Sequence, residues 1–253
     1  VAEGNLGRYT RTAFFASCPG AVSRLHYDHY DNLYVQLRGR KRFVLLEPLQ
    51  AHGLYPFPLH HPLDQRSRVH LDALPKRSSQ TFTKLGATRG FEVDLGPGDL
   101  LFIPHHWWHH VETTEGDAAV DGLSLSLNLW FDFEPRLVSP SLPLGQGLLI
   151  ELARHVESWL GNAIGANSIP AFLQSCATEL GAPFAPATAS EADEANASPQ
   201  SLPRPWLVCR NLLFLELATA WLGWGGVRPF FEALLPPERF AGLTKLEPEM
   251  SGS

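Results

Sequence analysis

The first half of the chain carries short runs in which apolar and polar residues alternate, the period of two that is typical of β-strands. Turns rich in Gly and Pro separate these runs. We expect strands at residues 12–17, 25–37, 41–46, 92–95, 100–103 and 123–131. The last of them alternates almost perfectly, which predicts a half-buried strand.

Two connections between these strands stand out. Residues 38–40 read Arg-Gly-Arg and predict a tight turn, so we expect the strands at 25–37 and 41–46 to pair as a hairpin. Residues 49–90 carry many Pro, His, Ser and Arg residues with little periodicity. A loop of that length inside a compact domain is usually functional or disordered.

The second half of the chain changes to helical spacing. Apolar residues recur every three or four positions at 148–160 and 169–180, which predicts two amphipathic helices. Residues 206–222 and 227–235 predict two further helices that are apolar on most faces and are therefore expected to be buried. Residues 182–205, rich in Ala, Ser, Pro and Glu, predict a flexible linker.

The strands precede the helices, without the alternation of a doubly wound sheet. This order predicts a mainly β fold, an antiparallel barrel or jelly roll, with a C-terminal α-helical appendage. We expect four segments: the barrel at residues 1–135, a helical segment at 145–181, the linker at 182–205 and C-terminal helices at 206–253.

Charge and cysteine usage narrow the function classes. The formal net charge of -6 argues against nucleic-acid binding, which normally needs a basic surplus. The three cysteines form no C-x-x-C pair, which is typical of a reducing compartment, and we expect a cytoplasmic or nuclear location. The apolar stretch 206–224 contains Arg210 and Glu216, so we expect a buried helix and no membrane association. Val1 is not an initiator methionine, so we expect the chain to be part of a longer gene product.

His26 and Asp28 form an H-x-D triplet in a segment expected to be a strand. Residues i and i+2 of a strand face the same side, so the imidazole and the carboxylate aim at a common point. Two histidines and one carboxylate are the ligand set of non-haem Fe(II) oxygenases. The third ligand is expected from residues 98–111, where the residues alone leave open His105, His106, His109 and His110.

Four further motifs accompany the triplet: Gly-Arg-Lys-Arg at 39–42, Leu-Tyr-Pro-Phe-Pro-Leu-His-His-Pro at 54–62, Gly-Pro-Gly-Asp at 96–99 and Trp-Trp-His-His at 107–110. Together they resemble the JmjC branch of the cupin-type, 2-oxoglutarate-dependent oxygenases, in particular the asparaginyl hydroxylases that inhibit hypoxia-inducible factor. The likeness runs from about residue 12 to 131, and more faintly to about 180. The family's N-terminal strands have no counterpart in the chain.

The resemblance implies a double-stranded β-helix that binds Fe(II) through His26, Asp28 and His109. It also implies that Lys41 anchors the far carboxylate of the cosubstrate 2-oxoglutarate, which is costly to bury without a cation. The residues that match the family's cosubstrate pocket are Ser23, Asn32, Asn128 and Trp130. The implied activity is hydroxylation of an Asn or Asp side chain in a protein substrate, such as an ankyrin-repeat protein.

Two other functions stay open: a JmjC lysine demethylase, which uses the same core, and a non-catalytic cupin that serves as a binding module. The resemblance further implies a homodimer, because the helices at 148–160 and 169–180 match the family's dimerisation segment. The chain's own C-terminal helices are the rival cover for the apolar stripes of that segment.

One departure from the resembled hydroxylases concerns the target residue. They carry Asp-Arg-Gln after the His-His-Pro loop, whereas this chain carries Asp64, Gln65 and Arg66, with the last two exchanged. Neighbours in an extended segment face opposite sides, so the exchange predicts that one polar partner is misplaced. Misplaced buried polar groups reduce discrimination steeply, and we therefore expect a preference for aspartate over asparagine.

Overall fold

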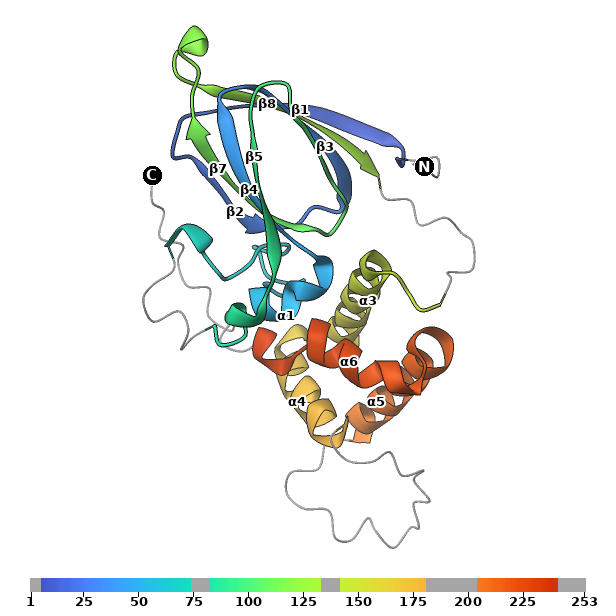
Figure 1. Cartoon of the computed structure of the whole chain (residues 1–253). Coiled ribbons are helices and arrows are strands. Elements are labelled where there is room, and N and C mark those ends of the chain that lie inside the picture. Colours follow the sequence, from blue (N-terminus) through green and yellow to red (C-terminus); the bar gives the residue numbers. More distant parts are fainter. Residues whose placement is uncertain (1–5, 74–81, 133–141, 181–203, 241–253) are drawn as a thin grey trace, which may run out of the picture. The chain divides into compact units, whose positions relative to one another are not determined.

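A computed structural model describes residues 6–73, 82–132, 142–180 and 204–240 (Figure 1). The chain divides into two compact units. The first, here called the β unit, comprises Val1–Phe57 and Pro62–Pro140. The second, the helical unit, comprises Pro58–His61 and Ser141–Ser253.

The β unit consists of two four-stranded antiparallel sheets (Figure 1). One sheet has the order β1-β8-β3-β6 and the other the order β2-β7-β4-β5. The strands are β1 Tyr9–Ser17, β2 Val22–His26, β3 Tyr30–Arg38, β4 Arg40–Leu46, β5 Gly90–Leu95, β6 Leu100–Ile103, β7 Trp108–Glu115 and β8 Ser124–Asp132. The mainly β fold expected from the sequence is therefore confirmed.

The expected hairpin between β3 and β4 is wrong. β3 pairs with β6 and β8, whereas β4 pairs with β5 and β7, so the chain passes from one sheet to the other at Gly39. Gly39 has a φ of 69°, and an added Cβ there would overlap the Glu115 carbonyl oxygen. The close approach of β7 at this corner thus requires glycine, and the short turn serves to change sheets.

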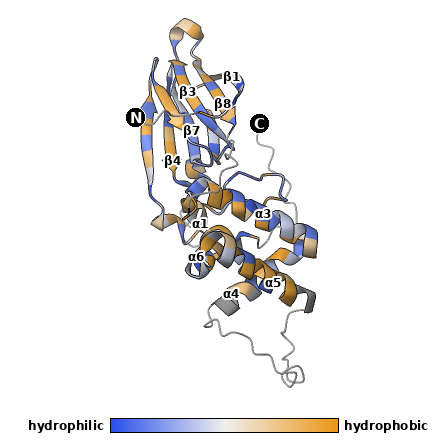
Figure 2. Ribbon diagram, turned by 90° about the vertical axis from the view of Figure 1, so that its right-hand side faces the viewer, coloured by the Kyte–Doolittle hydropathy of each residue, from blue (hydrophilic) through white to orange (hydrophobic). Residues whose placement is uncertain are grey.

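Strand β8 buries its polar side more deeply than its leucines. Ser124 and Ser126 are 0% exposed, whereas the leucines between and after them are only half-buried. Across the sheet, β8 pairs directly with the polar, buried positions of β3; the register is Asn32↔Trp130, Tyr34↔Asn128 and Gln36↔Ser126. The interior of the β unit is therefore polar along this wall, and Figure 2 shows the alternating hydropathy along its strands.

The remaining interior is apolar and packs against the same wall. A cluster formed by Tyr34, Phe43, Leu45, Leu95 and Ile103 fills it, and the Tyr34 and Phe43 rings meet edge to face at 4.8 Å. The long loop expected at 49–90 contains η1 Pro48–Gln50, α1 Ala51–Leu54, η2 Leu71–Ala73 and η3 Leu85–Ala87. Its residues 74–81 lie outside the described part.

The helical unit contains the four expected helices. They are α3 Gln146–Ile164, α4 Ile169–Leu180, α5 Arg204–Glu216 with a π-helical continuation Leu217–Leu222, and α6 Trp224–Leu234. None of the helices that the structure describes is long and apolar enough to cross a membrane. Residues 182–203 of the expected linker lie outside the described residues.

The burial expected for the C-terminal helices is only partly correct. α6 buries Val227, Phe230, Phe231 and Leu234, but α5 leaves Val208, Leu212 and Leu215 half exposed, at 52%, 58% and 50%. The cause is one-sided packing, since Phe214 of α5 contacts Phe231 of α6 at 5.4 Å and the opposite side of the helix faces away. The apolar stripes of α3 and α4 are largely buried, and the homodimer stays a prediction.

Candidate metal centre

His26, Asp28 and His109 come together at one end of the sheet β2-β7-β4-β5. His26 ends β2 and stands directly opposite His109 of β7, with ring centroids 4.2 Å apart. His109 Nε2 lies 3.8 Å from Asp28 Oδ2, and one ligand atom from each of the three residues lies within 4.8 Å of the others. Asp28 follows the strand and does not belong to it, so the expected strand alternation of His26 and Asp28 is wrong: the chain turns the carboxylate toward the histidines.

The neighbouring histidines have other partners. His110 is the next residue of β7 and faces the opposite side, where its Nε2 lies 3.1 Å from Glu112 Oε1. His105 Nδ1 contacts Asp31 Oδ1 at 2.9 Å, and His106 Nε2 contacts His29 Nδ1 at 3.2 Å. The geometry therefore groups His109 with His26 and Asp28, while metal ligation by the three stays a prediction.

Backbone carbonyls orient both imidazoles of the cluster. His26 Nδ1 lies 2.7 Å from the Arg24 oxygen, and His109 Nδ1 lies 3.0 Å from the Trp107 oxygen. A carbonyl only accepts, so each Nδ1 carries the hydrogen and each Nε2 keeps its lone pair for a metal. The sequence did not name these partners, which both lie two residues before the histidine.

Electrostatics favours the neutral imidazole of His26. Burial, reinforced by the nearby His109, lowers the pKa of His26 to about 4. At neutral pH this ring is therefore uncharged and able to act as a ligand. Two imidazole nitrogen donors and one carboxylate fit a divalent first-row metal such as Fe(II).

Lys41 is a buried cation on the same sheet. Its side chain is 7% exposed, and its contacts are Ser126 Oγ at 3.5 Å from Nζ and the Tyr34 ring at 5.9 Å. Among the residues that the structure describes, no carboxylate faces Lys41. Burial lowers the pKa of Lys41 because the charged form loses hydration, and an anionic ligand would offset that cost.

Lys41 and the metal cluster lie at separate points along one wall. Leu45 stands opposite His109, and Lys41 precedes Leu45 by four residues on the same face of β4. Four strand residues span about 13 Å, part of which the flexible lysine stem covers. The separation is therefore short enough for the two ends of one small molecule to reach both groups.

Three of the other predicted pocket residues line the opposite wall. Asn32 Oδ1, Asn128 Oδ1 and Trp130 Nε1 are buried and have no hydrogen-bond partner within the described part of the chain. Buried polar atoms normally have partners, so these three atoms indicate a ligand or ordered water inside the β unit. Ser23 does not join them: it lies on β2 with an exposed side chain.

Gln65 and Arg66 lie beside the metal cluster, with a backbone different from the one expected. Gln65 has a φ of 70°, and its carbonyl accepts from the Tyr27 amide at 3.0 Å. Arg66 forms a β-bridge with His26 and is exposed. The extended course expected for this step is therefore wrong, because Gln65 is in a left-handed turn, where strand alternation does not apply.

Sequence reasoning assigned no role to four interior residues: Tyr34, Gln36, Ser124 and Ser126. They occupy every second position of β3 and β8, in step with Asn32 and Asn128. The signal was present as the repeated spacing of polar residues in two expected strands. It was not decisive, because alternation does not say which side of a strand faces inward.

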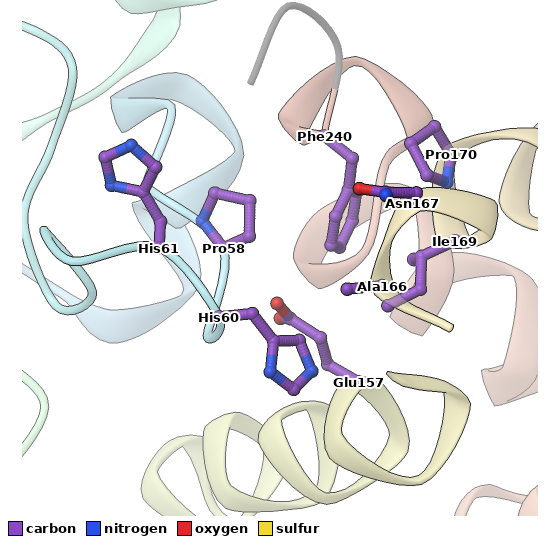
Figure 3. A pocket seen from close by; sticks show the side chains of 9 residues that line it. All are labelled: Pro58, His60, His61, Glu157, Ala166, Asn167, Ile169, Pro170 and Phe240. Atoms are coloured by element: carbon purple, nitrogen blue, oxygen red, sulfur yellow. The ribbon is translucent and has the colours of Figure 1, made fainter. Parts of the chain in front are cut away.

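Residues 58–61 of the motif at 54–62 belong to the helical unit and have a structural partner there. The Leu59 amide donates to Glu157 Oε1, while Glu157 Oε2 pairs with Arg239 Nη2 at 3.1 Å. Glu157 is 0% exposed and lies beside His60 in a pocket of about 130 Å³ (Figure 3). The buried ion pair accounts for part of this motif without any catalytic role.

A family model described as a cupin-like domain matches residues 6–136. The chain belongs to this cupin-like domain family. Membership in this family agrees with the two antiparallel sheets and with the clustered His26, Asp28 and His109. The narrower likeness to asparaginyl hydroxylases stays a prediction.

Several curated proteins are similar to this chain in sequence. HSPB1-associated protein 1 of Bos taurus is 34% identical over 116 residues, which cover 46% of this chain and 22% of that protein. Lysine-specific demethylase JMJ31 of Arabidopsis thaliana is 31% identical over 118 residues, covering 47% and 20%. Jumonji C domain-containing protein 5 of Drosophila melanogaster is 30% identical over 113 residues, covering 45% and 25%. The aligned part of the cupin-like chain thus spans about a quarter or less of each relative.

Solved structures are similar at lower levels. The structure of E. coli ycfD is 18% identical, with a TM-score of 0.33, and the match covers 84% of this chain and 41% of that one. A cupin superfamily protein from Desulfitobacterium hafniense is 16% identical, with a TM-score of 0.26, covering 52% and 72%.

Proposed function

We propose that this cupin-like domain is an Fe(II)- and 2-oxoglutarate-dependent oxygenase that hydroxylates a side chain of a protein substrate. The observation that carries the proposal is the joint presence of the His26, Asp28 and His109 cluster and the buried Lys41, which has no carboxylate partner in the described chain. The unpaired Trp130 Nε1 adds support, because it is a buried hydrogen-bond donor on the opposite wall and suits an anionic ligand.

The residues of the chain divide the work of binding and orientation. His26 and His109 present their Nε2 lone pairs, and Asp28 supplies the one carboxylate of the ligand set. Lys41 pairs with the far carboxylate of 2-oxoglutarate. The unpaired Oδ1 atoms of Asn32 and Asn128 only accept, so they suit ordered water molecules beside the cosubstrate. When bound, Fe(II) and 2-oxoglutarate supply the chemistry that inserts one atom of O2 into a C–H bond, releasing succinate and CO2.

The protein substrate approaches beside Arg66, which is exposed and adjacent to His26. A guanidinium at this place suits an acidic side chain, so we propose aspartate before asparagine, in a partner such as an ankyrin-repeat protein. The enzyme would act in the cytoplasm or nucleus. A homodimer is also proposed, and light scattering at high micromolar concentration tests it, with a monomer as the contradicting result.

Lysine demethylation is the second candidate function. Its support is the similarity to JMJ31 of Arabidopsis thaliana, which is named a lysine-specific demethylase. A methylated lysine is a cation, and Arg66 beside the cluster would repel it. A non-catalytic binding module is the third, and it predicts no turnover of 2-oxoglutarate.

An anaerobic titration separates the oxygenase from the binding module. Adding Fe(II) and then 2-oxoglutarate to the protein is expected to give the weak visible charge-transfer band of the iron chelate. His109→Ala should abolish the band, whereas His110→Ala and the surface variant His155→Ala should retain it. Loss of the band in His110→Ala, with the fold intact by circular dichroism, would contradict the assignment of the third ligand.

A further inference from the structure

The wall formed by β3 and β8 contains a chain of hydrogen bonds that ends at Lys41. Its members are Gln36, Tyr34 and Ser126, all buried, with Gln36 and Ser126 0% exposed. Lys41 comes from the other sheet and reaches this wall at Ser126 Oγ, 3.5 Å from Nζ. No metal ligand belongs to this chain of side chains.

Gln36 fixes the direction of the first hydrogen bond. Its Nε2 lies 2.6 Å from the Arg38 carbonyl oxygen and 2.8 Å from Ser124 Oγ, which uses both hydrogens of the amide group. Turning the amide over would place Oε1 against the Arg38 oxygen, which cannot donate. Oε1 therefore accepts, and the Tyr34 hydroxyl, 2.7 Å away, must donate to it.

The direction of this first hydrogen bond determines the direction of the next ones. Tyr34 has a single hydroxyl hydrogen, which is committed to Gln36, so its oxygen offers only lone pairs to its other partner, Ser126. Ser126 in turn donates to Tyr34 and offers a lone pair to Lys41. Burial raises the pKa of Tyr34 to about 12, so this hydroxyl keeps its hydrogen at working pH.

The consequence concerns the ammonium group of Lys41. One of its three N–H groups is directed at Ser126, and two remain for a ligand. The polar chain supplies no negative charge, so nothing in it competes with an anion. The 3.5 Å contact is long for a hydrogen bond, which leaves Lys41 room to move toward a bound carboxylate.

We propose that Gln36, acting through Tyr34 and Ser126, is a positioning residue that aims Lys41 at the far carboxylate of the cosubstrate. The inference rests on the proposed function, in which that carboxylate belongs to 2-oxoglutarate. According to this proposal, the preference for a dicarboxylate over a monocarboxylate depends on the direction of the hydrogen bonds as well as on the charge of Lys41.

Calorimetric binding with Mn(II) in place of Fe(II) tests the inference without turnover. The probes are 2-oxoglutarate and 2-oxopentanoate, which has the same chelating end and chain length but a methyl group at the far end. The quantity compared is the ratio of the two affinities. In wild type the ratio should favour 2-oxoglutarate strongly.

Tyr34→Phe keeps the ring against Phe43 but removes the hydroxyl that connects Gln36 to Ser126. The affinity ratio should therefore fall about fivefold, which is the effect of one buried hydrogen bond. Ser126→Ala should lower it similarly, and neither change should add to Lys41→Met. The KM for 2-oxoglutarate should rise in both variants while kcat at saturation stays near wild type. Tyr9→Phe, whose hydroxyl bonds Thr12 on the exposed strand β1, is the matched control and should change nothing.

Three outcomes distinguish the ideas. Failure of wild type to prefer 2-oxoglutarate overturns both the proposed cosubstrate and the positioning role. A wild-type preference that Tyr34→Phe and Ser126→Ala leave unchanged overturns the positioning role alone. Equal losses of affinity for both probes, together with a lowered melting temperature, would mean that the hydrogen bonds stabilise the fold. That result would also overturn the inference.

Discussion

The β unit and the helical unit each bury a charged side chain, and they treat the charge in opposite ways. In the helical unit, Glu157 pairs with Arg239 and accepts from the Leu59 amide. In the β unit, Lys41 has a hydroxyl and an aromatic ring but no carboxylate among the described residues. A buried charge that is paired within the protein can be purely structural. A buried charge without a partner indicates that a ligand completes the site.

The largest expected effect is the loss of turnover when Asp28, a proposed metal ligand, is removed. Asp28→Ala should abolish 2-oxoglutarate turnover, because two imidazoles alone form a weaker, wrongly charged site. Its melting temperature should change little, since no described group depends on Asp28 for charge compensation. Asp94→Ala, on the exposed side of β5, is the control and should keep full turnover. Residual turnover above a few per cent in Asp28→Ala would remove Asp28 from the ligand set.

The next effect is on stability and falls on the helical unit. Glu157→Gln leaves Arg239 buried without its counter-charge, and we expect a loss of about 3–5 kcal/mol in the free energy of unfolding. Glu232→Gln breaks the exposed Arg228–Glu232 pair of α6 and should cost only about 0.3–0.5 kcal/mol. Urea unfolding measures both, and equal losses would contradict the distinction between buried and exposed pairs.

The corresponding change in the β unit should affect binding and leave the fold intact. Lys41→Met should raise the KM for 2-oxoglutarate at least about tenfold, while metal affinity stays the same, because the lost contact is remote from the metal. An unchanged KM would assign the anchor to another cation.

The same residue predicts a pH dependence. Burial lowers the pKa of Lys41 in the folded state, so between the folded and unfolded pKa values the unfolded chain binds more protons. The ligand-free protein should therefore gain stability as pH rises through that window, and Lys41→Met should lack this gain. Binding of 2-oxoglutarate, which needs the charged lysine, should weaken over the same window. Melting curves and calorimetry from about pH 7 to pH 10 measure both trends.

The smallest effect concerns the target residue. Exchanging Gln65 and Arg66, as Gln65→Arg with Arg66→Gln, removes the guanidinium next to His26 and should shift preference from Asp to Asn peptides by about tenfold. Product formation on matched peptides provides the measurement. A wild type that already prefers asparagine, with an exchange that only lowers activity, would contradict this prediction. The loop, with its left-handed turn at Gln65, would then already be adapted to asparagine.

The sequence by itself determined the elements and the candidate chemistry. Alternation predicted strands that overlap all the observed strands except β7, although it merged β2 and β3 into one. Helical spacing predicted α3 and α4 within a few residues, and the H-x-D and Trp-Trp-His-His motifs named the three residues that cluster. These features are local, because each depends on residues within one strand or one turn of helix. Motif resemblance then selected His109 from four histidines.

Only the tertiary structure decided which sides of these elements meet. It placed β3 and β4 in different sheets, turned the serines of β8 inward and brought Asp28 to the histidines from beyond the strand end. The decisive contacts are non-local: Gln36 and Ser124 are 88 residues apart, and Lys41 and Ser126 are 85 apart. Alternation fixes that neighbours face opposite ways, but which side becomes the interior depends on what the rest of the chain brings to it.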